Sequence, residues 1–291
     1  MTGSTLTTVA PVAPALRRRS SAPMWIAVGV LVLFVLAAAI GPLLLGYDGT
    51  KVDNAARLLP PGSVLSTGQI AWLGTDQVGR DVAAQIMQGA RVSLIVGVAT
   101  LILAGLLGTL IGVVSGYYGG AIDSIFMRIA DIQLAFPSIL LAILISAILG
   151  PSIVNVIIVL AISRWVTFAR VARSATLAVK DREFVQAGRL LGAPDLSLLV
   201  RYVLPSALTS LVVVATVEFG LVIIAEASLS FLGLGTTDAM PSWGLIIANG
   251  RDYIPNAWWI STFPGIALAI VMVAIGVLGD RLRDRLDPSL A

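Results

Sequence analysis

The sequence predicts an all-α polytopic membrane protein with six transmembrane helices and one polar, helical insert. Hydrophobic residues make up 57% of the 291 residues and charged residues 12%, and the mean hydropathy is +0.96. These values are typical of a polytopic membrane protein. The apolar residues form continuous runs, unlike the alternating pattern of membrane β-strands. A polar segment that carries several arginines, residues 181–205, separates the fourth run from the fifth.

Each predicted span is a run of about 20 apolar residues, the length of helix that crosses the hydrocarbon core of a bilayer. The runs are residues 24–46, 93–117, 129–149, 153–171, 208–235 and 258–279. The third run is the weakest, because Arg128 and Asp131 lie at its start and Pro137 interrupts it. We expect a kink or an entry point at that proline.

Basic residues cluster in three places, and these clusters predict the orientation of the chain. They lie before the first run (17–19), around the polar insert (170–201) and after the last run (281–285). By the positive-inside rule all three clusters face the cytoplasm, which places both termini there. The segments that then face outward are residues 47–92, 150–152 and 236–257.

The expected organisation is one transmembrane domain, residues 23–280, between two cytoplasmic tails, residues 1–22 and 281–291. The first tail is rich in Thr, Ala, Pro and Ser, which favours a mobile segment. The first apolar run also has the basic flank of a signal peptide. It is longer than a usual signal-peptide core and no clear small-residue cleavage site follows, so we expect an uncleaved anchor.

The composition excludes several kinds of chemistry. The chain contains no His and no Cys, which removes thiolate nucleophiles, disulfides, imidazole bases and the usual transition-metal ligands. The GxxxxGK[ST] phosphate loop is missing too, so any dependence on ATP must come from a partner protein. We expect that this chain is not an enzyme and binds no cofactor.

The polar insert is expected to fold as two short helices that stand off the membrane. The first helix covers residues 181–191, where several residues at spacings of three and four share one stripe. Those residues are Phe184, Ala187, Gly188 and Leu191. Gly188 and Gly192 lie four residues apart, which would let the backbone approach a partner surface closely.

Glycine, proline and aspartate predict the turns of the insert. Gly192 is a natural helix stop, and Pro194 disfavours helical geometry in the residue before it. Asp195 is placed to cap a second helix that runs to about residue 204. Pro205 fits in the first turn of the next span. An interfacial amphipathic hairpin that only connects two spans is the alternative.

Two carboxylates lie inside the fifth run, where a charged group is costly and functional by default. Glu218 and Glu226 are eight residues apart, so they share roughly one helix face. For Glu218 we favour a structural role, such as pairing with Arg164 of the fourth run. For Glu226, beside Ser228 and Ser230, the choice between lining a pore and pairing helices stays open.

Small and aromatic residues predict further contacts. Gly97, Gly105, Gly112 and Gly116 share a face of the second run, which indicates close approach of another helix, in this chain or in a partner. Four aromatic residues near the outer boundary are expected to be interfacial anchors. They are Trp243, Tyr253, Trp258 and Trp259.

The outward segments are longer than connectors need to be. Thr75, Asp76, Arg80 and Asp81 predict a capped turn with an Arg–Asp pair. We expect a folded outer lip that packs against a partner, in preference to a substrate gate. The segment Asp238–Pro255 is a weaker candidate for receiving a protein outside the membrane.

Several strings, taken together and in order, resemble one family. They are LGTDQVGRD (Leu73–Asp81), GARVSL (Gly89–Leu94), GYYGGAIDSIFMRIADIQLAFPSILLAI (Gly116–Ile143), EASLSFLGLG (Glu226–Gly235), PSWG (Pro241–Gly244) and GDRLRDRLDP (Gly279–Pro288). With the insert, they make about residues 24–289 similar to the second-position permease subunit of dipeptide and oligopeptide ABC importers.

In that family this region, about residues 173–205 here, is a cytoplasmic coupling loop. Its pattern is Glu-Ala-Ala, three residues, Gly, nine residues, Ile, one residue, Leu-Pro. This chain keeps Ala187, Gly192, Leu204 and Pro205, and departs at Gln186, Gly188 and Tyr202. The resemblance implies that the insert sits in the groove of an ATPase and that the contact residues are Glu183, Gln186, Ala187, Gly188, Gly192, Leu204 and Pro205. The missing Glu at position 186 puts in doubt any salt bridge that the family makes there.

The resemblance further implies a half-pore in the inner membrane. Its partners would be a homologous second permease, one or two cytoplasmic ATPase subunits that bind ATP and Mg, and an extracytoplasmic substrate-binding protein. Short peptides are the expected substrate. Relatives of these permeases are also associated with nickel chelates, glutathione and other small solutes.

Other classes explain the sequence less well. A proton-coupled secondary transporter could use Glu218 and Glu226, but the six runs show no inverted repeat and such a protein would not need the insert. A membrane hydrolase is disfavoured by the missing His and Cys. A purely structural or pore-forming subunit does not account for the ordered strings.

Overall fold

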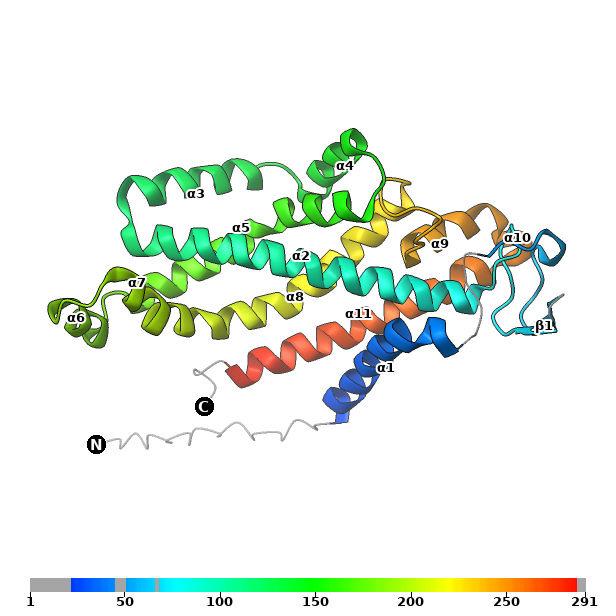
Figure 1. The fold of residues 1–291 in the computed structure, drawn as a ribbon, viewed down its shortest axis with the longest axis horizontal. Coiled ribbons are helices and arrows are strands. Elements are labelled where there is room, and N and C mark those ends of the chain that lie inside the picture. The colour runs from blue at the N-terminus through cyan, green and yellow to red at the C-terminus, as the bar shows by residue number, and fades with distance from the viewer. Residues whose placement is uncertain (1–21, 45–50, 66–67, 287–291) are drawn as a thin grey trace, which may run out of the picture.

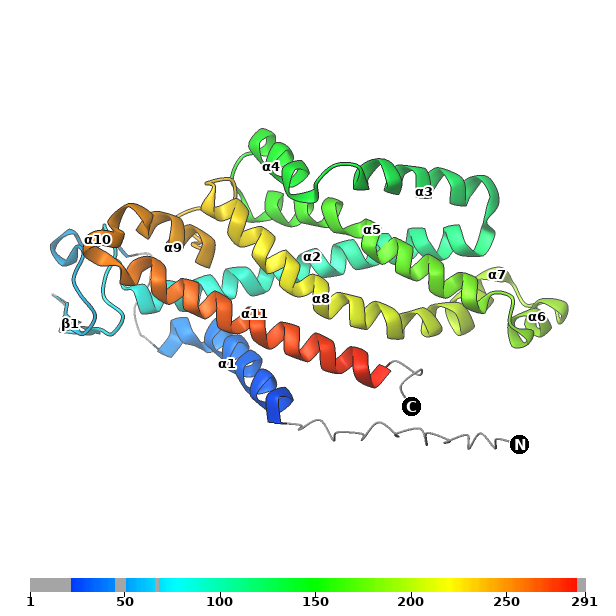
Figure 2. The same ribbon diagram turned by 180° about the vertical axis from the view of Figure 1, so that it is seen from behind.

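The structure, a computed structural model, describes residues 22–44, 51–65 and 68–286. Long helices run side by side along one axis of the molecule (Figure 1, Figure 2). They are α1 (Ala22–Leu44), α2 (Val82–Tyr118), α5 (Ile153–Val179), α8 (Leu204–Phe231) and α11 (Trp259–Leu286). The predicted tail 1–22 lies outside the described residues except for Ala22, as do Arg17, Arg18 and Arg19.

Short elements gather at the two ends of this bundle. One end, called the strand end, carries the short helices and strands into which the two long outward segments fold. They are the 3-10 helix η1 (Asn54–Ala56), the antiparallel strands β1 (Ser63–Val64) and β2 (Ile70–Ala71), α9 (Trp243–Gly250), the 3-10 helix η3 (Arg251–Tyr253) and α10 (Ile254–Ala257). The opposite end, called the loop end, carries α6 (Glu183–Leu190), α7 (Asp195–Leu198) and the π-helix η2 (Leu199–Val203).

The number of membrane spans agrees with the prediction. Among the described residues, five helices are long and apolar enough to cross a membrane. A sixth is reached if the bent pair α3 (Gly120–Leu134) and α4 (Ser138–Leu149) counts as one span.

The prediction of a single third helix over residues 129–149 is wrong. The axes of α3 and α4 meet at 86°, and Pro137 stands at the N-cap position of α4. Proline has no N–H to donate, and it disfavours helical geometry in the residue before it, here Phe136. The expected kink is thus a sharp corner.

Helix α2 begins at Val82, well before the predicted start at residue 93. The Asp81 carboxylate caps it by accepting a hydrogen bond of 2.8 Å from the backbone N–H of Ala84. Polar residues in the first turns of α2 interrupt the apolar run, so the run begins later than the helix. With 37 residues, α2 is about 55 Å long, more than the hydrocarbon core requires.

The most extensive helix contact joins α2 to α5, and small residues make it possible. A Cβ atom on Gly108 would clash with the Trp165 carbonyl oxygen, and one on Gly112 with that of Ala169. The predicted close contact is confirmed for Gly112 and Gly116, which meet α5 of this chain, and Gly97 instead meets Phe219 of α8. Gly105 makes only an ordinary contact, and Gly108 was not among the predicted residues.

The strand end holds a buried apolar cluster that joins α1, α2, α9 and α11. Trp243 and Trp259 are buried in it, and their ring N–H groups donate to the carbonyl oxygens of Ile86 (2.8 Å) and Thr75 (3.1 Å). The prediction of interfacial anchors is therefore wrong for these two residues, because their rings lie inside the packed end. Trp258 is half exposed.

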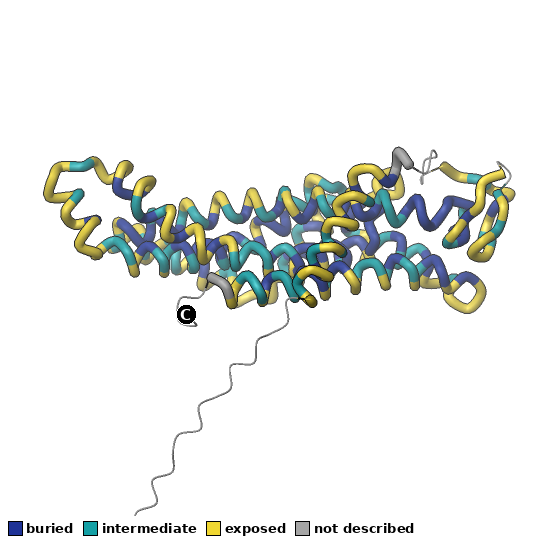
Figure 3. Tube along the Cα trace, turned by 90° about the horizontal axis from the view of Figure 1, so that it is seen from below, coloured by how far each residue is buried: buried dark blue, intermediate teal, exposed yellow. Residues whose placement is uncertain are grey.

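Buried residues form a stripe along the inner faces of the bundle, whereas the loop end is mostly exposed (Figure 3). At the chain's end α11 continues to Leu286, so the first part of the predicted tail 281–291 is helical. At the loop end, the segment that carries α6 and α7 projects beyond the long helices (Figure 1).

Candidate functional site

The protruding loop, residues 181–203, comprises α6, α7 and η2 and connects α5 to α8. Its two short helices pack through Val185 and Leu198, both fully buried. Gly188 permits this approach, since a Cβ there would lie 2.8 Å from Leu198 Cδ2. The close approach that Gly188 permits in this structure is therefore to a residue of its own chain.

The predicted stripe on α6 is only partly packed. Gly188 meets Leu198 and the centre of the Phe184 ring lies 5.8 Å from that of Tyr202, whereas Ala187 and Leu191 are exposed. Leu191 is 88% exposed and Phe184 51% exposed, because the inward side is taken by Val185. The first helix is confirmed with slightly tighter bounds.

The turn between α6 and α7 follows the predicted geometry at Gly192. Its φ of +80° lies in the left-handed region, and a Cβ added there would meet no atom within 4 Å, so backbone conformation alone favours glycine. The Ala193 N–H donates to the Gly188 carbonyl oxygen over 3.0 Å, which closes the helix end.

The second predicted cap is wrong. Pro194 occupies the N-cap position of α7, and Asp195 is its first residue. The Asp195 carboxylate accepts a hydrogen bond of 2.6 Å from the Tyr117 hydroxyl of α2. The chain then passes through η2 into α8, with Pro205 in the first turn as expected.

Three leucines form an apolar tip on the protruding loop. Leu190 and Leu191 are each 88% exposed and Leu196 is 71% exposed. A cluster of exposed apolar side chains on a polar segment marks an interaction surface. Of the predicted contact residues, Glu183, Gln186, Ala187 and Gly192 are exposed on the same loop, Gly188 is half-buried, and Leu204 and Pro205 begin α8.

Polar contacts fasten the loop end together. The Arg173 guanidinium of α5 donates two hydrogen bonds to the Asp123 carboxylate of α3, at 2.5 and 2.6 Å. Arg189 of α6 donates to the Tyr117 hydroxyl over 3.1 Å. This hydrogen bond raises the pKa of the Arg189 guanidinium above its usual range. Tyr117 was not among the predicted site residues; its signal is its place at the end of a long helix before two glycines.

Glu226 is fully buried between α8 and α2. The Ser230 hydroxyl donates to its Oε1 over 2.7 Å and the Ser93 hydroxyl to its Oε2 over 3.3 Å. Ser228 instead donates to the Ile224 carbonyl oxygen of its own helix, at 2.8 Å. The structure thus brings Ser230 to Glu226, adds Ser93, and leaves Ser228 apart.

Glu218 is also buried, and it faces Arg164 of α5. Their closest charged atoms, Arg164 Nη1 and Glu218 Oε2, are 3.5 Å apart. The expected pair between the fourth and fifth runs is present.

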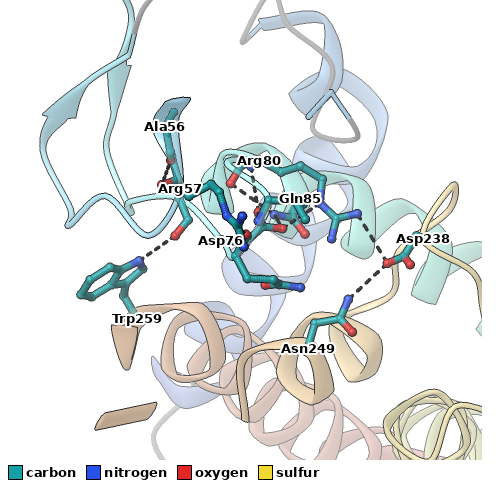
Figure 4. A network of polar contacts seen from close by, with 11 residues as sticks. Ala56, Arg57, Asp76, Arg80, Gln85, Asp238, Asn249 and Trp259 are labelled. Atoms are coloured by element: carbon teal, nitrogen blue, oxygen red, sulfur yellow. Dashed lines mark hydrogen bonds and ion pairs between the residues drawn. The ribbon is translucent and has the colours of Figure 1, made fainter. Parts of the chain in front are cut away.

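A polar network fastens the outward segments at the strand end (Figure 4). Arg80 Nε lies 2.7 Å from Asp76 Oδ2, and the Gln85 amide donates to the same oxygen over 3.0 Å. Arg80 also reaches Asp238 at 3.5 Å, and Asn249 of α9 donates to Asp238 over 3.2 Å. The predicted Arg–Asp turn is confirmed, and it ties the segment before α2 to the segment after α8.

These features define a class of protein: a multi-pass helical membrane protein with an exposed loop between α5 and α8. The family described as binding-protein-dependent transport system inner membrane component matches residues 108–291, and the chain belongs to this family. In the part of the chain that the structure describes, no group of three His, Cys, Asp or Glu residues could hold a metal ion.

Relatives at about two-fifths identity cover most of the chain. A di/tripeptide transport system permease protein of Pseudomonas aeruginosa is 40% identical, covering 89% of this chain and 86% of the relative. A dipeptide transport system permease protein of Alkalihalophilus pseudofirmus is 40% identical (90% and 85%), and a glutathione transport system permease protein of Pectobacterium atrosepticum is 39% identical (91% and 87%).

The fold has a counterpart among solved structures. A chain from the inward-facing MetNI methionine ABC transporter matches with a TM-score of 0.56 and 20% identity, covering 70% of this chain and 96% of that chain. At this level of identity the likeness concerns the fold alone. The fold is that of an ABC importer permease.

Proposed function

We propose that this chain forms half of the translocation pathway of an ATP-driven importer for short peptides. The protruding loop docks on a cytoplasmic ATPase, and the apolar tip fills a groove on it. The exposure of Leu190 and Leu191, each 88%, carries this proposal, because two adjacent exposed leucines at the end of a polar loop call for a protein partner.

The orientation follows from charge. Five arginines and one lysine gather at the loop end, on α5 and on the protruding loop, and the positive-inside rule places that end in the cytoplasm. The basic residues there are Arg170, Arg173, Lys180, Arg182, Arg189 and Arg201. Both termini then face the cytoplasm, and the strand end faces outward, where a substrate-binding protein delivers the substrate.

A second, homologous permease subunit completes the pathway. ATP and Mg bind to the ATPase subunits, of which one or two kinds serve the complex. Closure of the ATPases on ATP moves the protruding loops and turns the pathway from inward-facing to outward-facing, a rigid-body change of two halves about their interface. We assign the predicted contact residues to this docking region or to the junction between the protruding loop and α8. They are Glu183, Gln186, Ala187, Gly188, Gly192, Leu204 and Pro205.

The test is purification of the tagged chain from its host in mild detergent, with identification of the proteins that accompany it. We expect a second permease and at least one ATPase. Leu191→Asp should remove the ATPase from the complex while the second permease stays. Leu232→Asp is the matched control, because Leu232 is also exposed (55%) but follows α8 near the strand end. Retention of the ATPase by Leu191→Asp would refute docking through the apolar tip.

The substrate class rests on the relatives named for dipeptides and di/tripeptides. Growth on a dipeptide as the source of a required amino acid should depend on this chain. Glutathione is the second candidate, because a relative named for glutathione transport is almost as similar, at 39% identity. Competition of labelled dipeptide uptake by unlabelled tripeptide and by glutathione distinguishes the two.

A further inference from the structure

The buried ring of Tyr117 stands where α2 meets the protruding loop. Tyr117 is the penultimate residue of α2 and is 7% exposed. The end of α2 lies beside α7 in both ribbon views (Figure 1, Figure 2). Although the loop is covalently joined to α5 and α8 only, this tyrosine gives it a third attachment.

The hydroxyl of Tyr117 joins both short helices of the loop. It accepts a hydrogen bond of 3.1 Å from the Arg189 guanidinium of α6 and donates one of 2.6 Å to the Asp195 carboxylate of α7. The Arg189 guanidinium carbon also lies 5.4 Å from the centre of the tyrosine ring. Since the hydroxyl donates in one direction and accepts in the other, its orientation is fixed by two charged groups.

The same end of α2 is held against α5. The Lys180 ammonium group donates to the Gly116 carbonyl oxygen over 3.0 Å. A Cβ on Gly116 would lie 2.8 Å from Thr176 Cβ, so the two helix ends are in close contact. The last turn of α2 is therefore packed directly on the end of α5.

Helix α2 is suited to carry a movement of the loop to the opposite end. It is one unbroken helix of 37 residues, and its first turns hold Gln85, which bonds to Asp76 in the network of the strand end. A displacement at Tyr117 thus reaches the outward segments through one rigid element.

We propose that the Tyr117 hydroxyl is the joint that transmits movement of the protruding loop to α2. With this joint the loop drives three helices, α2 together with α5 and α8. The proposal rests on the proposed function, since it needs an ATPase that moves the loop. Tyr117 is a positioning residue, acting through Arg189 and Asp195, and is not itself a docking residue.

The test compares Tyr117→Phe with Tyr118→Phe in the reconstituted complex of permeases, ATPases and binding protein. Each change removes one hydroxyl. Tyr118 is the matched control, because its ring is half exposed (53%) and packs edge-on against Tyr117 at 5.2 Å. The measured quantities are the ATPase bound per permease, the rate of ATP hydrolysis and the number of ATP molecules hydrolysed per substrate imported.

We expect the Tyr117→Phe complex to keep its ATPase bound and to keep the rate of ATP hydrolysis. The number of ATP molecules consumed per imported substrate should rise roughly tenfold. Loss of a hydrogen bond to a charged group can produce an effect of this size. Tyr118→Phe should leave this ratio unchanged. A merely structural defect would lower the amount of complex, uptake and hydrolysis together, leaving the ratio constant.

Asp195→Ala provides a second, independent variant. It should raise the same ratio, and the double variant with Tyr117→Phe should be no worse than the more affected single variant, because both changes break one connection. An unchanged ratio in Tyr117→Phe, additive effects in the double variant, or loss of ATPase binding in Tyr117→Phe would each overturn the joint. If the unaltered chain binds no ATPase, the proposed function fails instead.

Discussion

Arg164 of α5 and Glu218 of α8 form an ion pair between two membrane-spanning helices, with 3.5 Å between Nη1 and Oε2. The two side chains are 18% and 6% exposed. Each charge is neutralised by the other in a place where neither is well hydrated, so the pair matters most when one member is removed.

Breaking this pair should destabilise the chain. Glu218→Gln leaves the Arg164 charge without its counter-ion, and we expect a loss of up to about 3 kcal/mol in the free energy of unfolding. The double change Arg164→Met with Glu218→Met should recover much of it, because neither charge remains. Thermal unfolding in detergent measures both. The control is Arg170→Gln, which breaks a half-exposed pair with Asp131 and should cost less than about 1 kcal/mol. A double variant less stable than Glu218→Gln would contradict this account.

Glu226 is expected to act as a hydrogen-bond acceptor between helices. Two hydroxyls donate to it, from Ser230 at 2.7 Å and Ser93 at 3.3 Å. A glutamine at 226 keeps one oxygen acceptor and can donate to the other hydroxyl. Glu226→Gln should therefore retain uptake and substrate preference, whereas Glu226→Leu should lower the amount of folded protein. Substrate uptake and yield after solubilisation check both. Loss of uptake in a fully assembled Glu226→Gln complex would establish a need for the carboxylate and revive the proton-coupled alternative.

Two glycines of α2, one turn apart, should respond in opposite ways to alanine. A Cβ on Gly108 would clash with the Trp165 carbonyl oxygen, whereas one on Gly105 would lie 3.8 Å from the Phe168 ring, an ordinary contact. We expect Gly108→Ala to cost about 1–3 kcal/mol by forcing α2 away from α5. Gly105→Ala should be neutral or slightly stabilising, because alanine favours the helix. Thermal unfolding of the two variants decides, and equal effects would contradict the packing of α2 on α5.

The strand end should depend on Asp76 far more than on Asp238. The buried Asp76 carboxylate accepts hydrogen bonds from the Arg80 side chain and from the backbone N–H groups of Val78 and Arg80. Asp76→Asn should cost about 2 kcal/mol, since it weakens charge-assisted bonds in a buried place. Asp238 is 72% exposed, so Asp238→Asn should cost less than about 1 kcal/mol. Rates of external proteolysis at residues 51–65 and 68–81 report on the folding of these segments, and faster cleavage in Asp238→Asn than in Asp76→Asn would reverse the ranking.

The apolar runs predict which segments are membrane spans, but they do not predict where each helix begins, because polar groups take part in the helix ends. The apolar pattern places the start of the second span at residue 93, because Gln85, Gln88 and Arg91 interrupt the run. The helix begins at Val82 since Asp81 caps it and the strand end covers its first turns. Burial against other elements decided this boundary, and the local sequence does not show that burial.

In the protruding loop, the predictions from single residues are confirmed where the structure depends only on neighbours a few residues away. Gly192 ends α6 and Pro205 opens α8, because a left-handed residue and a missing N–H are local properties. The predicted capping role of Asp195 is wrong because its partner is distant in the sequence. Its carboxylate bonds to Tyr117, 78 residues earlier in the chain, and that partner is decided by how α2 packs beside α7.

The sequence by itself determined that this is a helical membrane protein with about six spans, a kink at Pro137 and a polar loop between α5 and α8. Hydrophobic run length, the geometry of proline and glycine, and the order of the motifs suffice for this, because each acts within a short stretch of chain. The pairing of Glu218 with Arg164 was also expected from the sequence. Only the tertiary structure decided that Glu226 meets Ser93 and that Tyr117 meets the protruding loop. Such contacts depend on the rotation and depth at which two helices pack, and those are set by all the side chains of both helices together.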